Sequence, residues 1–283
     1  MLSLHTNNAA LSAQNSITRT QSQLSTSMTR LSTGFRINSA MDDAAGLQIA
    51  TRLKAQTSGM TVAMSNTQNS TSMLQTAEGA FDEVTNMLIR MKDLATQAAD
   101  ASSGAKDKTA MQSEYDALGL ELSNVMKNTT FGGNKLLVGG TLASSMTFQI
   151  GASSTETMAF DVSAKMTSLT ASLTSATANY AAASTGTELT STANATIALL
   201  ETAIGDVGTV RSALGAAANR LDHVNTNLSN IATNTKAATG RIMDVDFATE
   251  SSNMTSSQML LQAGTAMLKQ SNSMSSMVMS LLQ

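Results

Sequence analysis

The sequence predicts a mainly α protein in which long antiparallel helical rods form a coiled-coil-like bundle. One small β-hairpin region interrupts the helices, and the two chain ends pair as an outer helix pair. Two observations favour this fold class. The 283 residues contain no proline, the residue that most often ends or kinks a helix. Both ends also carry apolar residues at sevenfold spacing, the interval at which one side of a helix faces a partner helix.

The two terminal stripes match each other in length and spacing. The N-terminal stripe consists of Leu4, Leu11, Ile17, Leu24 and Leu31, with Met28 beside it. The C-terminal row consists of Leu260, Met267, Met274 and Leu281, flanked by Leu261, Leu268 and Val278. Since no other segment near either end offers an apolar face, we expect the two ends to pair with each other.

The interior of the chain begins with the longest helical pattern. Ser39-Ala-Met-Asp42 has the form of a capping box, which satisfies the free amides at a helix start. Apolar residues then keep one register from about residue 43 to 99, which predicts a helix roughly 85 Å long at 1.5 Å per residue. Ser102-Ser-Gly104 predicts a turn, and the 4-3-4-3 spacing that starts at Met111 predicts a second helix folded back antiparallel.

Glycines at 132–133 and 139–140 end this pattern, and two short alternating segments, 146–150 and 157–162, predict one β-hairpin. Residues 163–192 are mostly Ser, Thr and Ala with little periodicity, so we expect a surface loop there. The sevenfold register returns at about residues 190–235 and predicts a third long helix. That helix is expected to give way around Gly240, before the terminal striped helix.

Composition excludes several classes of function. Charged residues make up 13% and the net charge is −3, so no basic patch is available for nucleic acid. No stretch approaches the ~20 apolar residues of a membrane span. With no cysteine and only two histidines, His5 and His223, we expect no catalytic, cofactor or metal site and no enzyme activity. The N-terminus lacks the apolar core of a cleaved signal peptide, so export is expected to use a dedicated machine.

Six segments resemble the signature of bacterial flagellins. Residues 31–47 read LSTGFRINSAMDDAAGL, residues 76–80 TAEGA and residues 131–136 FGGNKL. Near the other end, residues 246–250 read DFATE, residues 262–264 QAG and residues 280–283 SLLQ. These segments cover both ends and most of the rods. The first residues, MLSLHTN, also resemble lateral, swarming-type flagellins.

The resemblance implies a division of the chain into five parts. Residues 1–42 would form an N-terminal inner-tube helix and joint, and 43–140 the N-terminal rods of a wall domain. Residues 141–192 would hold the hairpin and a short Ser/Thr-rich variable segment. Residues 193–238 would form the C-terminal wall rod, and 239–283 the joint and C-terminal inner-tube helix.

The function that the resemblance implies is that of a secreted structural subunit, self-assembling into the extracellular flagellar filament for swimming or swarming. Its polymerisation seam would lie at Leu24, Leu31, Leu260, Met267, Met274 and Leu281. Expected partners are further copies of the chain, an export chaperone and the export apparatus, and the filament cap and hook-junction proteins. A hook-filament junction protein, or another helical secreted assembly protein, is the alternative. A chemoreceptor-type signalling coiled coil lacks support, because no membrane anchor is present.

One charged segment resembles the patch by which many flagellins engage a vertebrate Toll-like receptor. Arg90, Leu94 and Glu114 are the residue types expected at three positions of that patch, whereas Lys92 and Asp93 replace the commoner Arg and Glu. The other interpretation is a solvated charged face on a rod, with Leu94 flanking the helix seam. The resemblance thus makes Arg90, Leu94 and Glu114 candidate receptor contacts.

Overall fold

The protein is described here by a computed structural model, which covers the backbone of residues 7–281 and the side chains of residues 7–274. It is mainly α, as the sequence predicts, and folds into two compact units. One unit contains the chain up to Thr57 and from Thr233 onward, and the other contains Ser58–Ala232. Two helices, α2 (Ala44–Ala99) and α6 (Ala193–Met243), contribute to both units.

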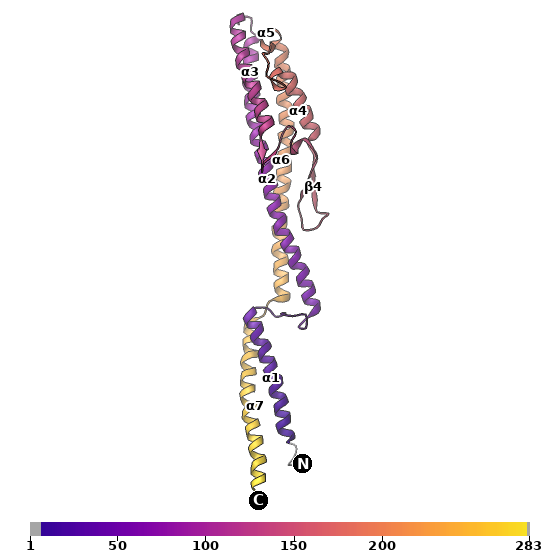
Figure 1. Ribbon diagram of the computed structural model, residues 1–283, viewed down its shortest axis with the longest axis vertical. Coiled ribbons are helices and arrows are strands. Elements are labelled where there is room, and N and C mark those ends of the chain that lie inside the picture. The colour runs from indigo at the N-terminus through magenta and orange to yellow at the C-terminus, as the bar shows by residue number, and fades with distance from the viewer. Residues whose placement is uncertain (1–6, 282–283) are drawn as a thin grey trace. The chain divides into compact units, whose positions relative to one another are not determined.

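In the terminal unit, α1 (Asn8–Thr33) and α7 (Phe247–Leu281) lie side by side along most of their length (Figure 1). The predicted pairing of the chain ends is therefore confirmed. Two short joints connect this pair to α2 and α6. Gly34 ends α1 in the left-handed conformation, at φ 76°, where a residue without a Cβ atom avoids strain.

The second unit packs the remaining parts of α2 and α6 with α3 (Ala105–Asn128) and α4 (Ser163–Ala176) (Figure 1). The apolar rows that the sequence predicts meet in one continuous core. Its fully buried side chains include Leu74, Phe81, Leu88, Met91, Tyr115, Leu122, Leu169, Leu173, Leu200 and Val207. Between α6 and α2, the Arg211 guanidinium pairs with Glu78 at 2.8 Å and with Asp82 at 3.1 Å.

Two small antiparallel ladders lie between α3 and α4. The first joins β1 (Thr130–Phe131) to β2 (Asn134–Lys135), and the turn glycines between them have positive φ. The second joins β3 (Met146–Gln149) to β4 (Thr157–Phe160), and its place confirms the predicted hairpin. The rings of Phe148 and Phe160 stack with centroids 6.2 Å apart on the buried face of this hairpin. A 3₁₀ turn, η1 (Thr141–Ala143), precedes β3.

The predicted surface loop at 163–192 is wrong. This segment forms α4, a 3₁₀ turn η2 (Ala178–Tyr180) and a short helix α5 (Glu188–Ser191). Four side chains of α4 at 3-4-3 spacing are buried in the core: Met166, Leu169, Leu173 and Ala176. The composition, poor in large apolar residues, hid a helix whose few large side chains all share one face.

Two predicted helix boundaries also need correction. The third long helix continues through Gly240 and ends at Met243, beyond the predicted end near residue 235. Before α2, Ser39 to Asp42 form a separate turn in which the Asp42 carboxylate accepts from the amides of Asn38 and Ser39, at 3.0 and 2.9 Å. The α2 amides are capped instead by Asp43, whose carboxylate accepts from Gly46 N at 2.8 Å.

Candidate functional site

The pairing face of α1 and α7 alternates small side chains with larger, mostly aliphatic ones. Residues of reduced exposure recur at intervals of three and four on both helices. On α1 they are Ala10, Ala13, Ile17, Thr20, Leu24, Ser27 and Leu31, and on α7 they are Glu250, Met254, Ser257, Leu261, Gly264, Leu268 and Ser271. This 3-4 spacing is typical of a coiled-coil seam. Among the side chains described in α1 and α7, only Ser27, Glu250 and Ser257 are buried, and none of these is apolar.

Polar contacts fix the register of this pair at both of its described ends. At one end, the side-chain amide of Asn7 donates to the Ser271 hydroxyl at 3.2 Å and to the Ser271 carbonyl at 3.3 Å. At the other, the Arg30 guanidinium lies 3.8 Å from the Glu250 carboxylate. The pair is therefore aligned in the chain itself, before any contact with a second molecule.

The residues proposed for the polymerisation seam fall into two groups. Leu24 and Leu31 lie on the pairing face and are partly buried. Leu260, Met267 and Met274 lie on the neighbouring row of α7 and are 60, 69 and 56% exposed. The side chain of Leu281 lies outside the described residues. The row Leu260–Met267–Met274 is therefore not used in the pairing of α7 with α1, and the flanking residues Leu261 and Leu268 occupy that face.

The two joints of the terminal unit are hydrogen-bonded to each other. Arg36 N donates to Met243 O at 2.6 Å, and Val245 N donates to Gly34 O at 3.0 Å. The Arg36 guanidinium adds a bond of 2.9 Å to Ile242 O. These bonds tie together two segments more than two hundred residues apart in the sequence, so the start of α7 is held by the joint that follows α1.

Two exposed carboxylates organise the turns around these joints. The backbone amides of Ser39 and Asn38 hold the pKa of Asp42 below its ordinary value of 3.8. Hydrogen bonds from the Thr249 hydroxyl and the Ala248 amide likewise lower the pKa of Asp246, at the start of α7. Donors that point at the ionised oxygen favour the charged form. Both groups therefore act as caps.

The candidate receptor contacts are brought together only in part. Arg90 of α2 and Glu114 of α3 form an ion pair, with Nε 2.8 Å and Nη2 2.6 Å from Glu114 Oε1, and their side chains are 55 and 46% exposed. Leu94 is 3% exposed and belongs to the core between the helices. The pair Arg90–Glu114 thus presents a surface that a partner can touch, whereas Leu94 supports the helices from inside.

A polar cluster that the sequence analysis did not identify anchors residues 177–192 to α3. The buried Gln112 side chain donates to Asp116 at 2.8 Å and to Glu188 at 2.9 Å, and it accepts from Leu189 N at 2.7 Å. The Asn179 side-chain Nδ2 donates to the Asp116 carboxylate at 2.7 Å. Their wide separation in sequence leaves no local signal for this cluster.

Burial raises the pKa of the Tyr115 phenol, which donates to Ala176 O at 2.7 Å within the same region of the rod. This bond connects the middle of α3 with the end of α4. A phenol that is buried, hydrogen-bonded and kept neutral has a structural role.

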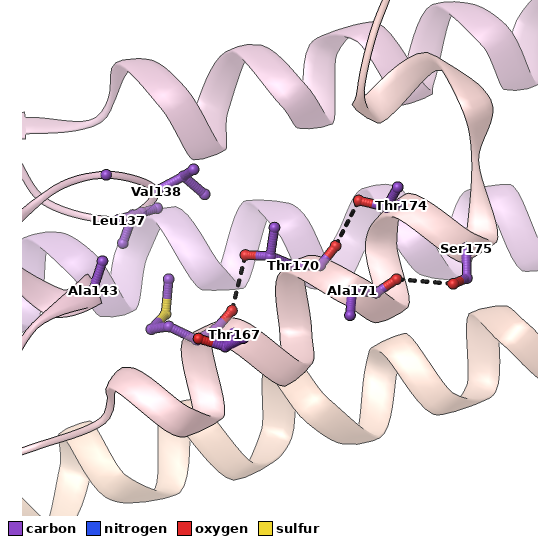
Figure 2. A pocket seen from close by; sticks show the side chains of 10 residues that line it. Leu137, Val138, Ala143, Thr167, Thr170, Ala171, Thr174 and Ser175 are labelled. Atoms are coloured by element: carbon purple, nitrogen blue, oxygen red, sulfur yellow. Dashed lines mark hydrogen bonds between the residues drawn. The ribbon is translucent and has the colours of Figure 1, made fainter.

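A cleft of about 540 Å³ lies between α4 and residues 137–143 (Figure 2). Figure 2 shows that its lining comes from apolar side chains, such as Leu137, Val138 and Ala143, and from threonines and a serine of α4. The Thr170, Thr174 and Ser175 hydroxyls donate to carbonyls one turn earlier in their own helix. Since these groups are used inside α4 and no charged side chain lines the cleft, it offers little ligand chemistry.

Within residues 7–281, no three His, Asp or Glu side chains gather in a way that could hold a metal ion. His223 is exposed on α6, and His5 lies outside the described residues. In the described part of the chain, none of the helices is both long and apolar enough to cross a membrane.

Comparison with known proteins gives matches at both ends of the chain. Residues 4–141 match the family described as the bacterial flagellin N-terminal helical region, and residues 197–282 match the bacterial flagellin C-terminal helical region. Flagellin A of Vibrio anguillarum is 33% identical over the full length of both chains. Polar flagellin F of Vibrio parahaemolyticus is 48% identical over 59% of this chain, and that alignment spans 44% of the relative. The chain thus matches less than half the length of some of its curated relatives.

A solved structure from Vibrio parahaemolyticus, described as a flagellar hook-associated protein, shares the fold. Its TM-score is 0.55 at 17% identity, covering 72% of this chain and all of that one. The paired terminal helices and the long packed rods define a helical structural protein of coiled-coil-like construction. The chain belongs to the bacterial flagellin family. This family consists of structural proteins of the flagellar filament.

Proposed function

We propose that this chain is the structural subunit that polymerises into an extracellular flagellar filament for swimming or swarming, and that it has no enzymatic role. One structural observation carries the proposal. The α1–α7 pair leaves the row Leu260–Met267–Met274 exposed, and the described apolar side chains of its pairing face, such as Leu24 and Leu31, are only partly buried. A pair of long helices that gains so little apolar burial by itself depends on further contacts for its stability.

We expect a second copy of the chain to pack against the exposed row Leu260–Met267–Met274. Burying one large apolar side chain contributes about 1.5–3 kcal/mol, so three such residues per subunit provide a substantial driving force for assembly. The exposed Leu11 and Met28 of α1 add apolar surface of the same kind. Membership in the flagellin family favours the role of filament subunit over that of a hook-filament junction protein. The similarity to the solved hook-associated structure supports only the fold.

Seeded polymerisation of purified subunits tests the assembly surface. Leu260→Asp should abolish filament growth, because assembly would bury an unpaired carboxylate, and the rod unit should remain folded by circular dichroism. Gln262→Asp adds the same charge to an exposed residue of α7 outside the row, and it should polymerise normally. Filament growth of Leu260→Asp at the wild-type rate would contradict the proposal. Long continuous filaments from wild type would also separate a filament subunit from a junction protein.

We also propose that different segments of the chain form different layers of the filament. Residues 1–42 and 239–283 serve the inner tube and its joints, whereas 43–140 and 193–238 form the wall. Residues 141–192 replace the larger variable region of longer flagellins. The hydrogen-bonded joints, Arg36 to Met243 and Val245 to Gly34, support a functional boundary there.

The proposed partners follow from this role. Further copies of the chain form the filament, and a cap and hook-junction proteins contact its ends. An export chaperone and export apparatus deliver the subunit. The net charge of −3 and the absence of a basic patch in the sequence argue against nucleic acid.

A vertebrate Toll-like receptor is a further proposed partner, and the exposed Arg90–Glu114 pair supports it. Reporter assays with folded monomers should show reduced potency for Arg90→Ala, since an arginine at an interface often carries much of the binding energy. Lys165→Ala, at an exposed lysine of α4, should match wild type. Leu94→Ala should act through the core, lowering thermal stability together with potency. Equal potency of Arg90→Ala and wild type would contradict the receptor contact.

A further inference from the structure

The exposed face of α7 is rich in methionine. Met259 is 60% exposed beside Leu260, and Met267 and Met274 of the same face are 69 and 56% exposed. By contrast, Met91, Met126 and Met166 of the rod unit are almost completely buried. The thioethers on the terminal helix are therefore accessible to reagents in the single chain, and those in the rod core are shielded by packing.

The composition makes exposed thioethers the main targets of mild oxidants, and these three share that exposure with Met28 and Met41. The chain has no cysteine and no tryptophan, so neither thiols nor indoles compete for a peroxide. Oxidation turns a flexible apolar side chain into a polar sulfoxide and disrupts methionine-rich interfaces. A sulfoxide on this face would have to be buried, with its oxygen unpaired, when a second copy covers the row.

We propose that Met259, Met267 and Met274 form an oxidation site at which hydrogen peroxide switches the unassembled subunit to an assembly-incompetent form. This inference rests on the proposed polymerisation through α7. In each reaction the methionine sulfur attacks one peroxide oxygen, an S–O bond forms and the O–O bond breaks. The departing hydroxide becomes water with the proton released from the attacked oxygen. Methionine loses two electrons and peroxide is reduced.

Partial oxidation of wild-type subunits provides the first test. A subunit pool treated with hydrogen peroxide until each exposed methionine is partly oxidised is seeded, and filaments are separated from the remaining soluble protein. Peptide mass spectrometry should find sulfoxide at Met259, Met267 and Met274 depleted about tenfold in the filaments, the factor expected when an unpaired polar group must be buried. Equal sulfoxide fractions in filaments and soluble protein at all three positions would overturn the proposal.

Methionine-to-leucine variants then show which residues make polymerisation sensitive to peroxide. The variants are made in a Met28→Leu background, which removes the exposed thioether of α1. There the triple variant Met259→Leu, Met267→Leu and Met274→Leu should polymerise after a peroxide dose that stops the Met28→Leu chain. Met41→Leu removes a thioether that is 96% exposed in the turn before α2, and it should stay as sensitive as the Met28→Leu chain. Methionine sulfoxide reductase should restore polymerisation of oxidised wild type. A triple variant that loses assembly to the same peroxide dose would overturn the site.

The proposed function can fail separately from this inference. Untreated wild type that never polymerises on seeds would overturn the filament function itself. Untreated wild type that polymerises, together with fully oxidised wild type that polymerises at the same rate, would overturn only the oxidation site. Met259, Met267 and Met274 should also oxidise more slowly in intact filaments than in free subunits, because assembly covers their side chains.

Discussion

Gly264 of α7 packs directly against Ile17 of α1: a Cβ atom at Gly264 would lie 2.9 Å from Ile17 Cγ1. Contacts between real Cβ atoms and heavy atoms are almost never this short. The close approach of the two helices thus depends on a residue without a side chain, as in other helix pairs built on small residues. On the α7 side of the pairing face, the small residues Ser257, Gly264 and Ser271 accordingly alternate with larger ones.

Gly264→Val should open the α1–α7 pair and slow filament growth, because the branched side chain collides with the stiff Ile17 side chain. Ile17→Ala in the same chain should restore much of the loss by making room for valine. Hydrogen exchange of α1 and α7 in the subunit, together with seeded growth, measures both effects. If the double variant is as impaired as Gly264→Val alone, the contact between these two residues is not the cause.

Glycine-to-alanine substitutions at two positions of the rod unit should change the free energy of unfolding in opposite directions. Gly205 lies within α6 with open space around it, so Gly205→Ala should stabilise the unit by up to about 1 kcal/mol through helix propensity. At Gly119 of α3, a Cβ would lie 2.7 Å from the Thr177 hydroxyl, so Gly119→Ala should lower the free energy of unfolding. Thermal unfolding of the two variants and of wild type measures both changes in stability. A stabilised Gly119→Ala would show that residues 177–192 do not pack there.

The rods were predictable because their apolar residues keep one period over many turns. The predicted helix at 43–99 is observed as Ala44–Ala99, and the predicted hairpin as β3 and β4. Periodicity alone does not fix which of two neighbouring rows faces the partner within the chain. The sevenfold pattern favours Leu260 and Met267 as the α7 row of the seam, whereas the pair uses the adjacent row of Leu261, Gly264 and Leu268. Gly264 in that row allows the close approach of the two helices.

Helix α4 and the cluster around Gln112 were missed for different reasons. The four buried residues of α4 do follow helical spacing, but the Ser- and Thr-rich sequence between them masked the pattern. Gln112 and Glu188 are seventy-six residues apart in the sequence, and only the folded chain brings them within 2.9 Å. Among the receptor candidates, spacing could place Arg90 and Leu94 on one helix but could not show that Leu94 is buried.

Gln112→Leu should loosen residues 177–192 without unfolding the rods. The substitution leaves the buried Leu189 amide without its acceptor and removes one of several donors from Asp116 and from Glu188. A buried group left unpaired costs about 1–3 kcal/mol. Hydrogen exchange should rise at Leu189 and its neighbours, and the melting temperature should fall. Gln68→Leu, at an exposed glutamine of α2, serves as the control with little effect. Unchanged protection at Leu189 in Gln112→Leu would contradict a role for the cluster in anchoring this segment.

The start of α7 should depend on the charge of Asp246. The Thr249 hydroxyl and the Ala248 amide lower the pKa of this carboxyl below 3.8 in the folded chain. A carboxyl with a lowered pKa stabilises the fold at pH values above its unfolded pKa, and that contribution is lost as the pH falls through the folded value. Protection of the first α7 amides, corrected for intrinsic exchange, should therefore decrease as the pH is lowered below 3.8. Asp246→Asn should show weaker protection at neutral pH and less change with acid. If wild type and Asp246→Asn follow the same pH profile, the carboxylate does not cap this helix.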